Sequence, residues 1–216
     1  MKNKFELIIF DWDGTLVNSV DWIVSCMQKA ALQCDIPVPD TAAVKNIIGL
    51  SIEKALENLF PGMDKKNQEH LITCYSHYFF SRQTGKEDLF DGVGDMLEHF
   101  KSEGYLLAVA TGKKSTGLAK AMQGTGLEVF FDATRGADQT ASKPDPLMIN
   151  EIVNELQVSK DKVVMIGDST HDLEMARNAD VSAVGVCCGA HSRDRLEHYR
   201  PIACLQKTTE LRELLV

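Results

Sequence analysis

The chain has 216 residues, of which 44% are apolar, so it can bury a sizeable core in one or two domains. Its 23 basic and 31 acidic residues give a net charge of −8, which argues against nucleic acid or an anionic membrane as the main partner. No apolar stretch approaches the ~20 residues of a membrane span, and charges interrupt the N-terminal segment too often for a signal peptide. We therefore expect a cytoplasmic protein.

Short apolar runs alternate along the chain with helical patterns. The helical patterns fall at residues 93–100, 118–122 and 149–156. Strands that alternate with helices build βαβ units and a mostly parallel sheet, so we predict an α/β fold. The predicted strands are residues 5–10, 106–110, 163–166, 183–186 and 202–205.

Residues 19–88 break this alternation. They contain no convincing strand, although a βαβ unit would need only one helix there. Apolar stripes with helical spacing recur at 20–27, 52–60 and 71–79, and prolines punctuate the turns between them. We predict an all-helical insertion over residues 19–88, called the cap below, within a core made of residues 1–18 and 89–216.

The first predicted strand runs into Asp11-Trp12-Asp13-Gly14-Thr15. In an open α/β sheet, ligands bind at the carboxyl ends of the strands. Strand geometry sends Asp11 and Asp13 to opposite faces, so both can serve one site only if the chain turns there. Gly14 supplies the backbone freedom for that turn.

Three further motifs follow in order, each beside an apolar segment: Val109-Ala110-Thr111-Gly112, Lys143-Pro144 and Gly167-Asp168-Ser169-Thr170-His171-Asp172. Together with the first motif, this series resembles the haloacid dehalogenase superfamily of phosphohydrolases. Within it, the chain is similar to the phosphoglycolate phosphatase-like group, which has an inserted helical cap. The resemblance implies a Rossmann-like parallel sheet core flanked by helices.

The resemblance also implies catalytic roles. Asp11 matches the nucleophile that forms an aspartyl phosphate, and Asp13 matches the general acid and base. The Thr111 hydroxyl and the Gly112 amide match donors to a phosphoryl oxygen, and Lys143 matches the cation beside the phosphoryl group. Many relatives carry Asn where this chain has Gly112, so a side-chain contact is missing here.

An oxygen-rich site for Mg²⁺ is implied by the same motifs. The direct ligands would be Asp11, the backbone carbonyl of Asp13, and Asp168, while Asp172 would hold a metal-bound water. Acids at a helix N-terminus are also favoured by the helix dipole, which is the alternative interpretation of Asp168 and Asp172.

Candidate substrate contacts are Gly112 and Lys113 in the core and Gly49 and Ser51 in the cap. Lys113 adjoins Thr111-Gly112 and extends the anion site, unless it is only a solvated charge. The segment around Gly49 resembles one that faces the active site in relatives, but Ser51 is equally well explained as a helix N-cap.

The six cysteines form no C-x-x-C motif and are interpreted as small buried apolar residues. Vicinal Cys187 and Cys188 could in principle bind a metal or form a strained disulfide, although adjacent strand side chains point apart. We expect His171 to be exposed or to support a ligand. The other five histidines show no metal-ligand spacing.

We therefore expect a Mg²⁺-dependent phosphatase of a small phosphorylated metabolite, with phosphoglycolate suggested by resemblance alone. A β-phosphoglucomutase-like mutase and a pyrophosphatase share the core chemistry and remain open. A haloacid dehalogenase would not need Asp13, Asp168 or Asp172, and a receiver-like signalling domain is shorter and lacks a cap. Monomer and homodimer both remain open.

Overall fold

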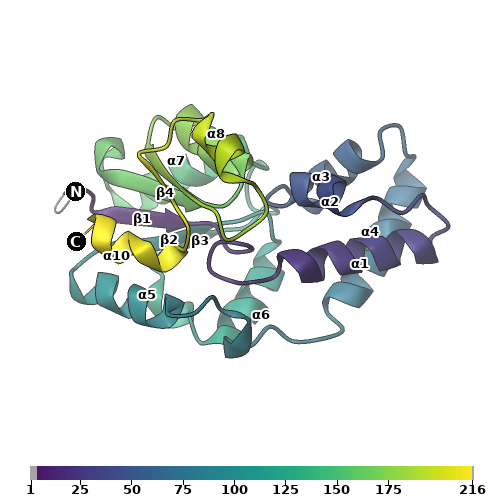
Figure 1. Ribbon diagram of the computed structural model, residues 1–216, viewed down its shortest axis with the longest axis horizontal. Helices are drawn as coiled ribbons and strands as arrows, with labels where there is room; N and C mark the ends of the chain where they lie inside the picture. The colour runs from purple at the N-terminus through teal and green to yellow at the C-terminus, as the bar shows by residue number, and fades with distance from the viewer. Residues whose placement is uncertain (1–3, 216) are drawn as a thin grey trace.

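Strand β1 lies at the centre of a six-stranded parallel sheet with the order β3-β2-β1-β4-β5-β6 in the computed structural model, which describes residues 4–215 (Figure 1). Leu7 pairs with Leu106 on one side and Val163 on the other. The strands are β1 (Leu7–Phe10), β2 (Leu106–Ala110), β3 (Ala133–Arg135), β4 (Val163–Gly167), β5 (Ser182–Val186) and β6 (Ala203–Leu205).

Both faces of β1 are buried, which explains its unbroken apolar sequence. Leu7 and Ile9 belong to an apolar cluster with α7 and α8, whereas Ile8 and Phe10 belong to a cluster with α5, α6 and α10. The sheet is therefore the middle of three layers. The core helices are α5 (Val93–Ser102), α6 (Ser115–Thr125), α7 (Leu147–Leu156), α8 (Thr170–Asn178), α9 (Arg193–Glu197) and α10 (Leu211–Leu215).

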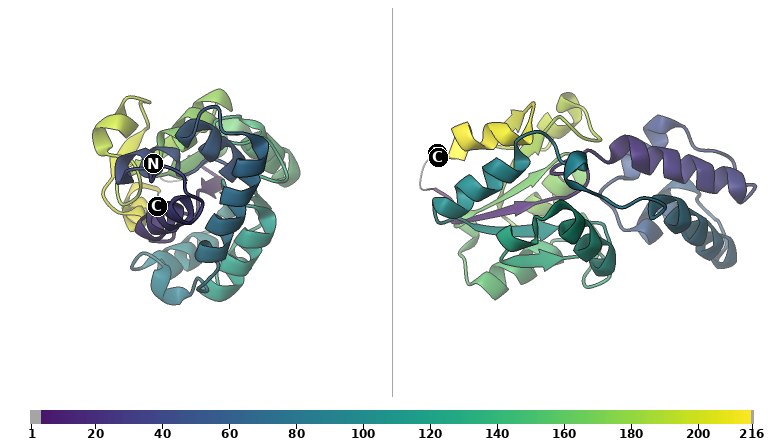
Figure 2. Two further views of the ribbon diagram at one scale, coloured as in Figure 1. Left: turned by 90° about the vertical axis from the view of Figure 1, so that its right-hand side faces the viewer. Right: turned by 90° about the horizontal axis from the view of Figure 1, so that it is seen from below.

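The cap holds its own apolar cluster, separate from the two clusters of the sheet. Its helices are α1 (Val20–Gln33), α2 (Thr41–Ile47), α3 (Ile52–Leu59) and α4 (Lys65–Phe79), and α1 packs along α4. Asp40, Ser51 and Asp64 cap the last three of these helices with side-chain oxygens. The right-hand view of Figure 2 shows the cap as a second lobe beyond one edge of the core.

The chain leaves and re-enters the core at one place. Val17 forms a β-bridge with Leu89, and the Asn18 amide donates to the Asp88 carbonyl at 2.8 Å. This pairing supports our division into a core (1–18 and 89–216) and a cap (19–88), which we keep as a proposal.

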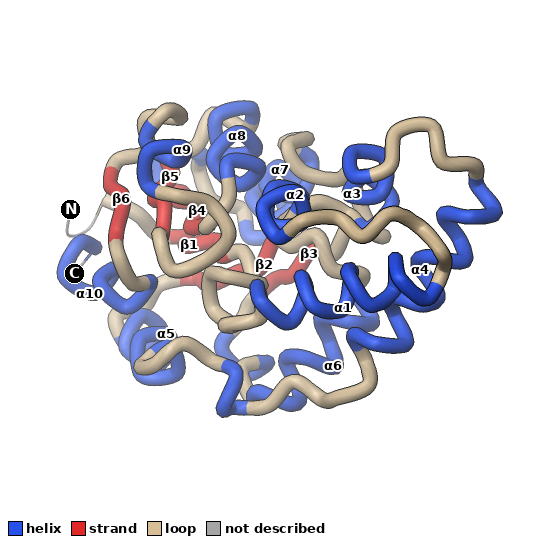
Figure 3. Tube along the Cα trace, turned by 45° about the vertical axis from the view of Figure 1, so that its right-hand side comes forward, coloured by secondary structure: helices blue, strands red, loops and turns tan. Residues whose placement is uncertain are grey.

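The predicted fold class is confirmed: a parallel sheet is flanked by helices, and helices α1–α5 intervene between β1 and β2 (Figure 3). The sequence prediction omitted β3, a three-residue edge strand. Single turns of 3₁₀ helix occur at Lys86–Asp88, Glu128–Phe130, Lys160–Lys162 and Thr208–Glu210. Within residues 4–215, no helix is long and apolar enough to cross a membrane.

Candidate active site

The turn after β1 gathers the carboxylates of the first motif at the carboxyl edge of the sheet. The Asp11 amide still donates to the Ile166 carbonyl at 2.9 Å, as a continuation of β1. Gly14 then adopts φ = +79°, and its amide donates to the Val17 carbonyl at 2.8 Å. A side chain at Gly14 would collide with the Asp168 carboxylate. Glycine is therefore required both for the turn and for the approach of Asp168.

A buried ammonium group joins two of the acids. Lys143 Nζ lies 2.7 Å from Asp11 Oδ1 and 2.6 Å from Asp172 Oδ1, and the three side chains are almost fully buried. Burial raises the pKa of Asp11 to about 7, against the attraction of Lys143. Burial would lower the pKa of Lys143, but the carboxylates of Asp11 and Asp172 raise it above its usual value. Lys143 is therefore charged and fixes the orientation of Asp11.

Asp168 is the third buried acid of the group. Its Oδ1 accepts a hydrogen bond from the Thr15 hydroxyl at 2.9 Å, and its Oδ2 accepts one from the Ala190 amide at 2.7 Å. Burial, with the nearby charges of Asp11 and Asp172, raises the pKa of Asp168 well above the usual value. Three buried carboxylates face a single buried ammonium, so the group favours an additional cation.

The same acids have the geometry of a cation site. One carboxylate oxygen each of Asp11, Asp168 and Asp172 lies within 4.8 Å of the others. Asp11 Oδ2 is buried and has no hydrogen-bond partner among residues 4–215. Hard oxygen ligands of this kind suit Mg²⁺. The chemistry of the donors and the unpaired Asp11 oxygen thus fit the predicted magnesium ion, whereas the carboxylate of Asp13 lies outside this group.

Asp13 faces the cavity between core and cap. Its Oδ1 accepts a hydrogen bond from the Ser19 hydroxyl at 2.6 Å, and its Oδ2 lies 2.8 Å from Lys113 Nζ. Lys113 Nζ also lies 4.4 Å from the ring centroid of Phe79 in the cap. These contacts hold the Asp13 carboxyl in one orientation, and they make Lys113 a half-buried cation of the site rather than a solvated surface charge.

The end of β2 supplies neutral donors. The Thr111 amide is bound to the Arg135 carbonyl at 3.0 Å, and Thr111 Oγ1 accepts the Lys113 amide at 3.3 Å. The hydroxyl hydrogen of Thr111 is therefore left to donate elsewhere. Thr111 and Gly112 both line the same cavity as Asp11.

Packing explains why this chain has glycine at position 112, where many relatives carry Asn. A Cβ placed on Gly112 would lie 2.6 Å from the Gly49 carbonyl oxygen and closer still to that of Leu50. The cap loop between α2 and α3 thus rests directly on the core loop after β2. The Ser51 amide donates to Ser142 Oγ at 2.9 Å, which adds a second contact between the cap and the core.

Cap and core enclose a cavity of about 190 Å³. Its core side contains Asp11, Asp13 and Thr111, with Gly112 and the two following lysines. Its cap side is mainly apolar and comes from all four cap helices and the α2–α3 loop. The cap residues that line it include Ile23, Met27, Ile47, Ile48, Gly49, Leu50, Ile52, Ala55, Ile72, Tyr75, Ser76, Phe79 and Phe80.

The structure does not gather every predicted residue at the cavity. Ser51 Oγ accepts the Lys54 amide at 3.2 Å as the N-cap of α3, and Ser51 is absent from the cavity lining within residues 4–215. His171 Nε2 lies 2.9 Å from the Asn46 carbonyl oxygen, so it bridges core and cap. Cys188 lies beside the Gly14 carbonyl, with Sγ at 3.5 Å.

Several residues of the site were not identified from the sequence. Thr15 and Ser19 stand inside or just after the first motif, and their hydroxyl groups mark them as partners for the motif carboxylates. Tyr75 and Phe79 lie on an apolar helical stripe of the cap and were not singled out within it. Both pack against the apolar cluster of the cap and also line the cavity, opposite the core loops that follow β1 and β2.

The comparisons agree with this geometry. The model of the haloacid dehalogenase-like hydrolase family matches residues 8–186. The chain belongs to this family. It is 33% identical over 209 residues to "Probable phosphatase IndB" of Dickeya dadantii (strain 3937), covering 95% of this chain and 91% of that protein.

Two further relatives cover almost the whole chain. Pyrophosphatase PpaX of Listeria innocua is 29% identical over 98% of this chain and 96% of its own. The crystal structure of a predicted phosphoglycolate phosphatase from Haemophilus somnus 129pt has a TM-score of 0.82 at 21% identity, covering 98% of each chain. This family membership makes the protein a hydrolase of the haloacid dehalogenase-like type and confirms the resemblance inferred from the four motifs.

Proposed function

We propose that the protein is a Mg²⁺-dependent phosphatase that hydrolyses a small phosphate monoester through an aspartyl phosphate on Asp11. The observation that carries this proposal is the state of the Asp11 carboxylate at the cavity. Lys143 holds Oδ1 at 2.7 Å, while buried Oδ2 has no hydrogen-bond partner among residues 4–215. A carboxylate fixed on one side and unpaired on the other suits both cation binding and attack on phosphorus.

The remaining roles follow from position. Asp13 protonates the departing alkoxide and then activates the water that cleaves the aspartyl phosphate, with its carboxyl oriented by Ser19 and Lys113. The Thr111 hydroxyl and the Gly112 amide donate to a phosphoryl oxygen. Lys143 neutralises part of the charge that develops on the transferring group.

Asp11, Asp168 and Asp172 are the acids that would hold Mg²⁺. The ion would offset the repulsion between the negative phosphate and these carboxylates, and it would stabilise the charge of the transferring group. Asp172 Oδ1 already pairs with the Lys143 ammonium and Oδ2 accepts from Ser169, which supports an indirect role for Asp172 through water, whereas both oxygens of Asp168 accept from neutral donors. Asp168 is anchored through Thr15 and is the better direct ligand.

The cavity also bears on the leaving group. Its cap side offers carbon surface from α1 and α4, and its cations are limited. Among the lining residues, Lys113 is paired with Asp13 at 2.8 Å, and Lys114 is paired with Glu53 at 2.9 Å. A leaving group with carbon surface would bury well here, whereas a second phosphate or a carboxylate would compete for lysines already paired.

Phosphoglycolate therefore stays a candidate on resemblance, and a larger ester with carbon surface is favoured by the lining. Pyrophosphate, named for the Listeria relative, is the second candidate because that relative covers nearly the whole chain. A phosphosugar mutase would use the same acids but would return the phosphoryl group to sugar instead of water.

A panel assay tests the proposal. Phosphoglycolate, pyrophosphate, a hexose phosphate and an aromatic phosphate monoester are each incubated with Mg²⁺, and phosphate release is compared with that of the Asp11→Asn variant. We expect Asp11-dependent release with the highest kcat/KM for an ester that carries carbon surface. Conversion of the hexose phosphate to its isomer without phosphate release would identify a mutase instead.

A further inference from the structure

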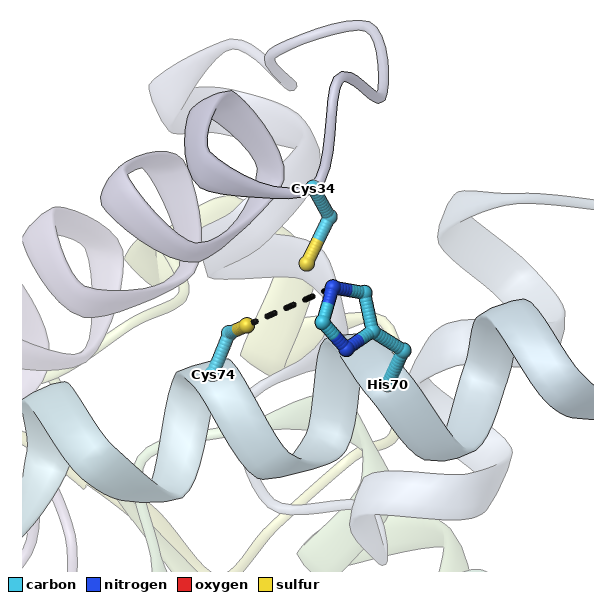
Figure 4. A group of neighbouring side chains, drawn as sticks. All are labelled: Cys34, His70 and Cys74. Atoms are coloured by element: carbon cyan, nitrogen blue, oxygen red, sulfur yellow. Dashed lines mark hydrogen bonds between the residues drawn. The ribbon is translucent and has the colours of Figure 1, made fainter.

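A second group of ligand-type side chains lies in the cap, outside the active site. Cys34 follows the C-terminal end of α1, and His70 and Cys74 stand four residues apart on α4. Figure 4 shows the three side chains pointing toward one another between the two helices. His70 Nε2 lies 4.0 Å from Cys74 Sγ, and one nitrogen or sulfur atom of each residue lies within 4.8 Å of the others.

These separations are close to those of a zinc site. Zn–S bonds of about 2.3 Å and Zn–N bonds of about 2.0 Å in a tetrahedral site place neighbouring ligand atoms about 3.5–3.8 Å apart. The cap atoms need to approach by only a few tenths of an ångström to one ångström to reach that spacing. Rotation of the three side chains supplies this, because all three already point to one place.

The surroundings also suit a cation that enters from solvent. Cys74 is buried, Cys34 is half-buried and His70 is exposed. Two thiolates and a neutral imidazole would offset the charge of a divalent ion, and the exposed side leaves a position for water.

We propose that Cys34, His70 and Cys74 form a second metal site of this protein, which binds one Zn²⁺ with water as the fourth ligand. On binding, the two thiols release two protons to solvent and two Zn–S bonds form, while the neutral imidazole donates through one ring nitrogen. No residue changes its oxidation state. The spacing of His70 and Cys74, one helical turn apart, is the sequence signal of this site.

The site joins two helices that carry the cavity wall. Ile23 and Met27 belong to α1, and Ile72, Tyr75 and Phe79 belong to α4. The cysteine–histidine group lies at the end of α1 away from the sheet (Figure 1). A metal ion there would tie the C-terminal end of α1 to the middle turns of α4, so its role is to stabilise the cap rather than to take part in hydrolysis.

Cobalt titration of the full chain tests the proposal. The protein is kept in a non-thiol reductant with excess Mg²⁺, which occupies the carboxylate site, and Co²⁺ is added. We expect one Co²⁺ per chain with thiolate charge-transfer absorption and the intense visible bands of a tetrahedral centre, and displacement by one Zn²⁺. Zn²⁺ should also raise the Tm in a concentration-dependent way.

Variants locate the site. Cys34→Ser, Cys74→Ser and His70→Gln should each weaken Co²⁺ and Zn²⁺ binding by more than the 10- to 100-fold typical of losing a supporting contact, because each removes a direct ligand. The matched controls are Cys204→Ser in the core and His77→Gln, a histidine on the same helix; both should bind as the wild type does.

Other results would overturn the proposal. They are the absence of thiolate charge-transfer absorption in the reduced protein, or an unchanged cobalt spectrum in Cys34→Ser and Cys74→Ser. A Cys34–Cys74 disulfide that forms readily while the reduced protein ignores Zn²⁺ would assign this pair to redox chemistry. Because the readouts are spectra and Tm, they do not depend on the phosphatase proposal.

Discussion

Replacement of Gly112 by alanine should open the cap. The new Cβ would lie 2.6 Å from the Gly49 carbonyl oxygen and closer to that of Leu50, whereas Cβ atoms essentially never come within 3.0 Å of such atoms. Both obstacles are backbone, so the cap loop itself must move by several tenths of an ångström. Overpacking of this kind costs about 1–3 kcal/mol. If that cost falls on cap closure, the closed form loses about 5- to 150-fold in population.

The assay is kcat/KM for the best ester of the panel, measured beside thermal unfolding. We expect kcat/KM of Gly112→Ala to be about 5- to 150-fold lower than that of the wild type, while the core stays folded. Gly94→Ala on α5 is the matched control, because among residues 4–215 no atom beyond its chain neighbours and its own helix backbone lies within 4 Å of the added Cβ. Wild-type kcat/KM in Gly112→Ala would refute the reasoning that the close approach of cap and core loops controls activity.

The other predictions concern the buried charges and the cap. Lys143→Met leaves Asp11 and Asp172 without their cation, so urea unfolding should show a loss of about 3–5 kcal/mol along with lost activity; unchanged stability would mean that the pair is not needed for folding. Chelation of Mg²⁺ should abolish phosphate release and re-addition should restore it, which sustained turnover in chelator would contradict. Ser51→Ala should lower stability by about 1 kcal/mol in thermal unfolding without reordering the substrates, since its hydroxyl caps α3. Phe79→Ala should raise KM for carbon-rich esters more than for pyrophosphate, and an equal effect on both would remove Phe79 from the leaving-group contact.

Much of the core could be predicted because its strands are buried on both faces. The run from Leu7 to Phe10 is continuously apolar and is followed at once by acids and a glycine. A short run of this kind indicates a strand that is buried on both faces. The acids after it mark the carboxyl edge of the sheet, where ligands bind. By contrast, β3 at Ala133–Arg135 has three residues at the sheet edge, with two of them only half-buried, so no apolar run reveals it.

The cap was predicted as helical, but its functional side chains could not be separated from its packing side chains. Periodicity places Tyr75 and Phe79 on an apolar stripe, and a stripe can face either a neighbouring helix or a cavity. Likewise, Cys34 is distant in sequence from His70 and Cys74, so their convergence depends on how α1 packs along α4. Both features depend on tertiary contacts that local sequence patterns do not encode.

Trapping the proposed intermediate tests the central claim most directly. Asp13→Asn keeps Asp11 as nucleophile but cannot activate the hydrolytic water, so an activated phosphate ester should leave a phosphorylated enzyme. The protein is quenched in acid and its intact mass is measured. The account predicts one added phosphoryl group in Asp13→Asn and none in Asp11→Asn. Equal phosphorylation of the two variants would show that Asp11 is not the nucleophile and would contradict the account.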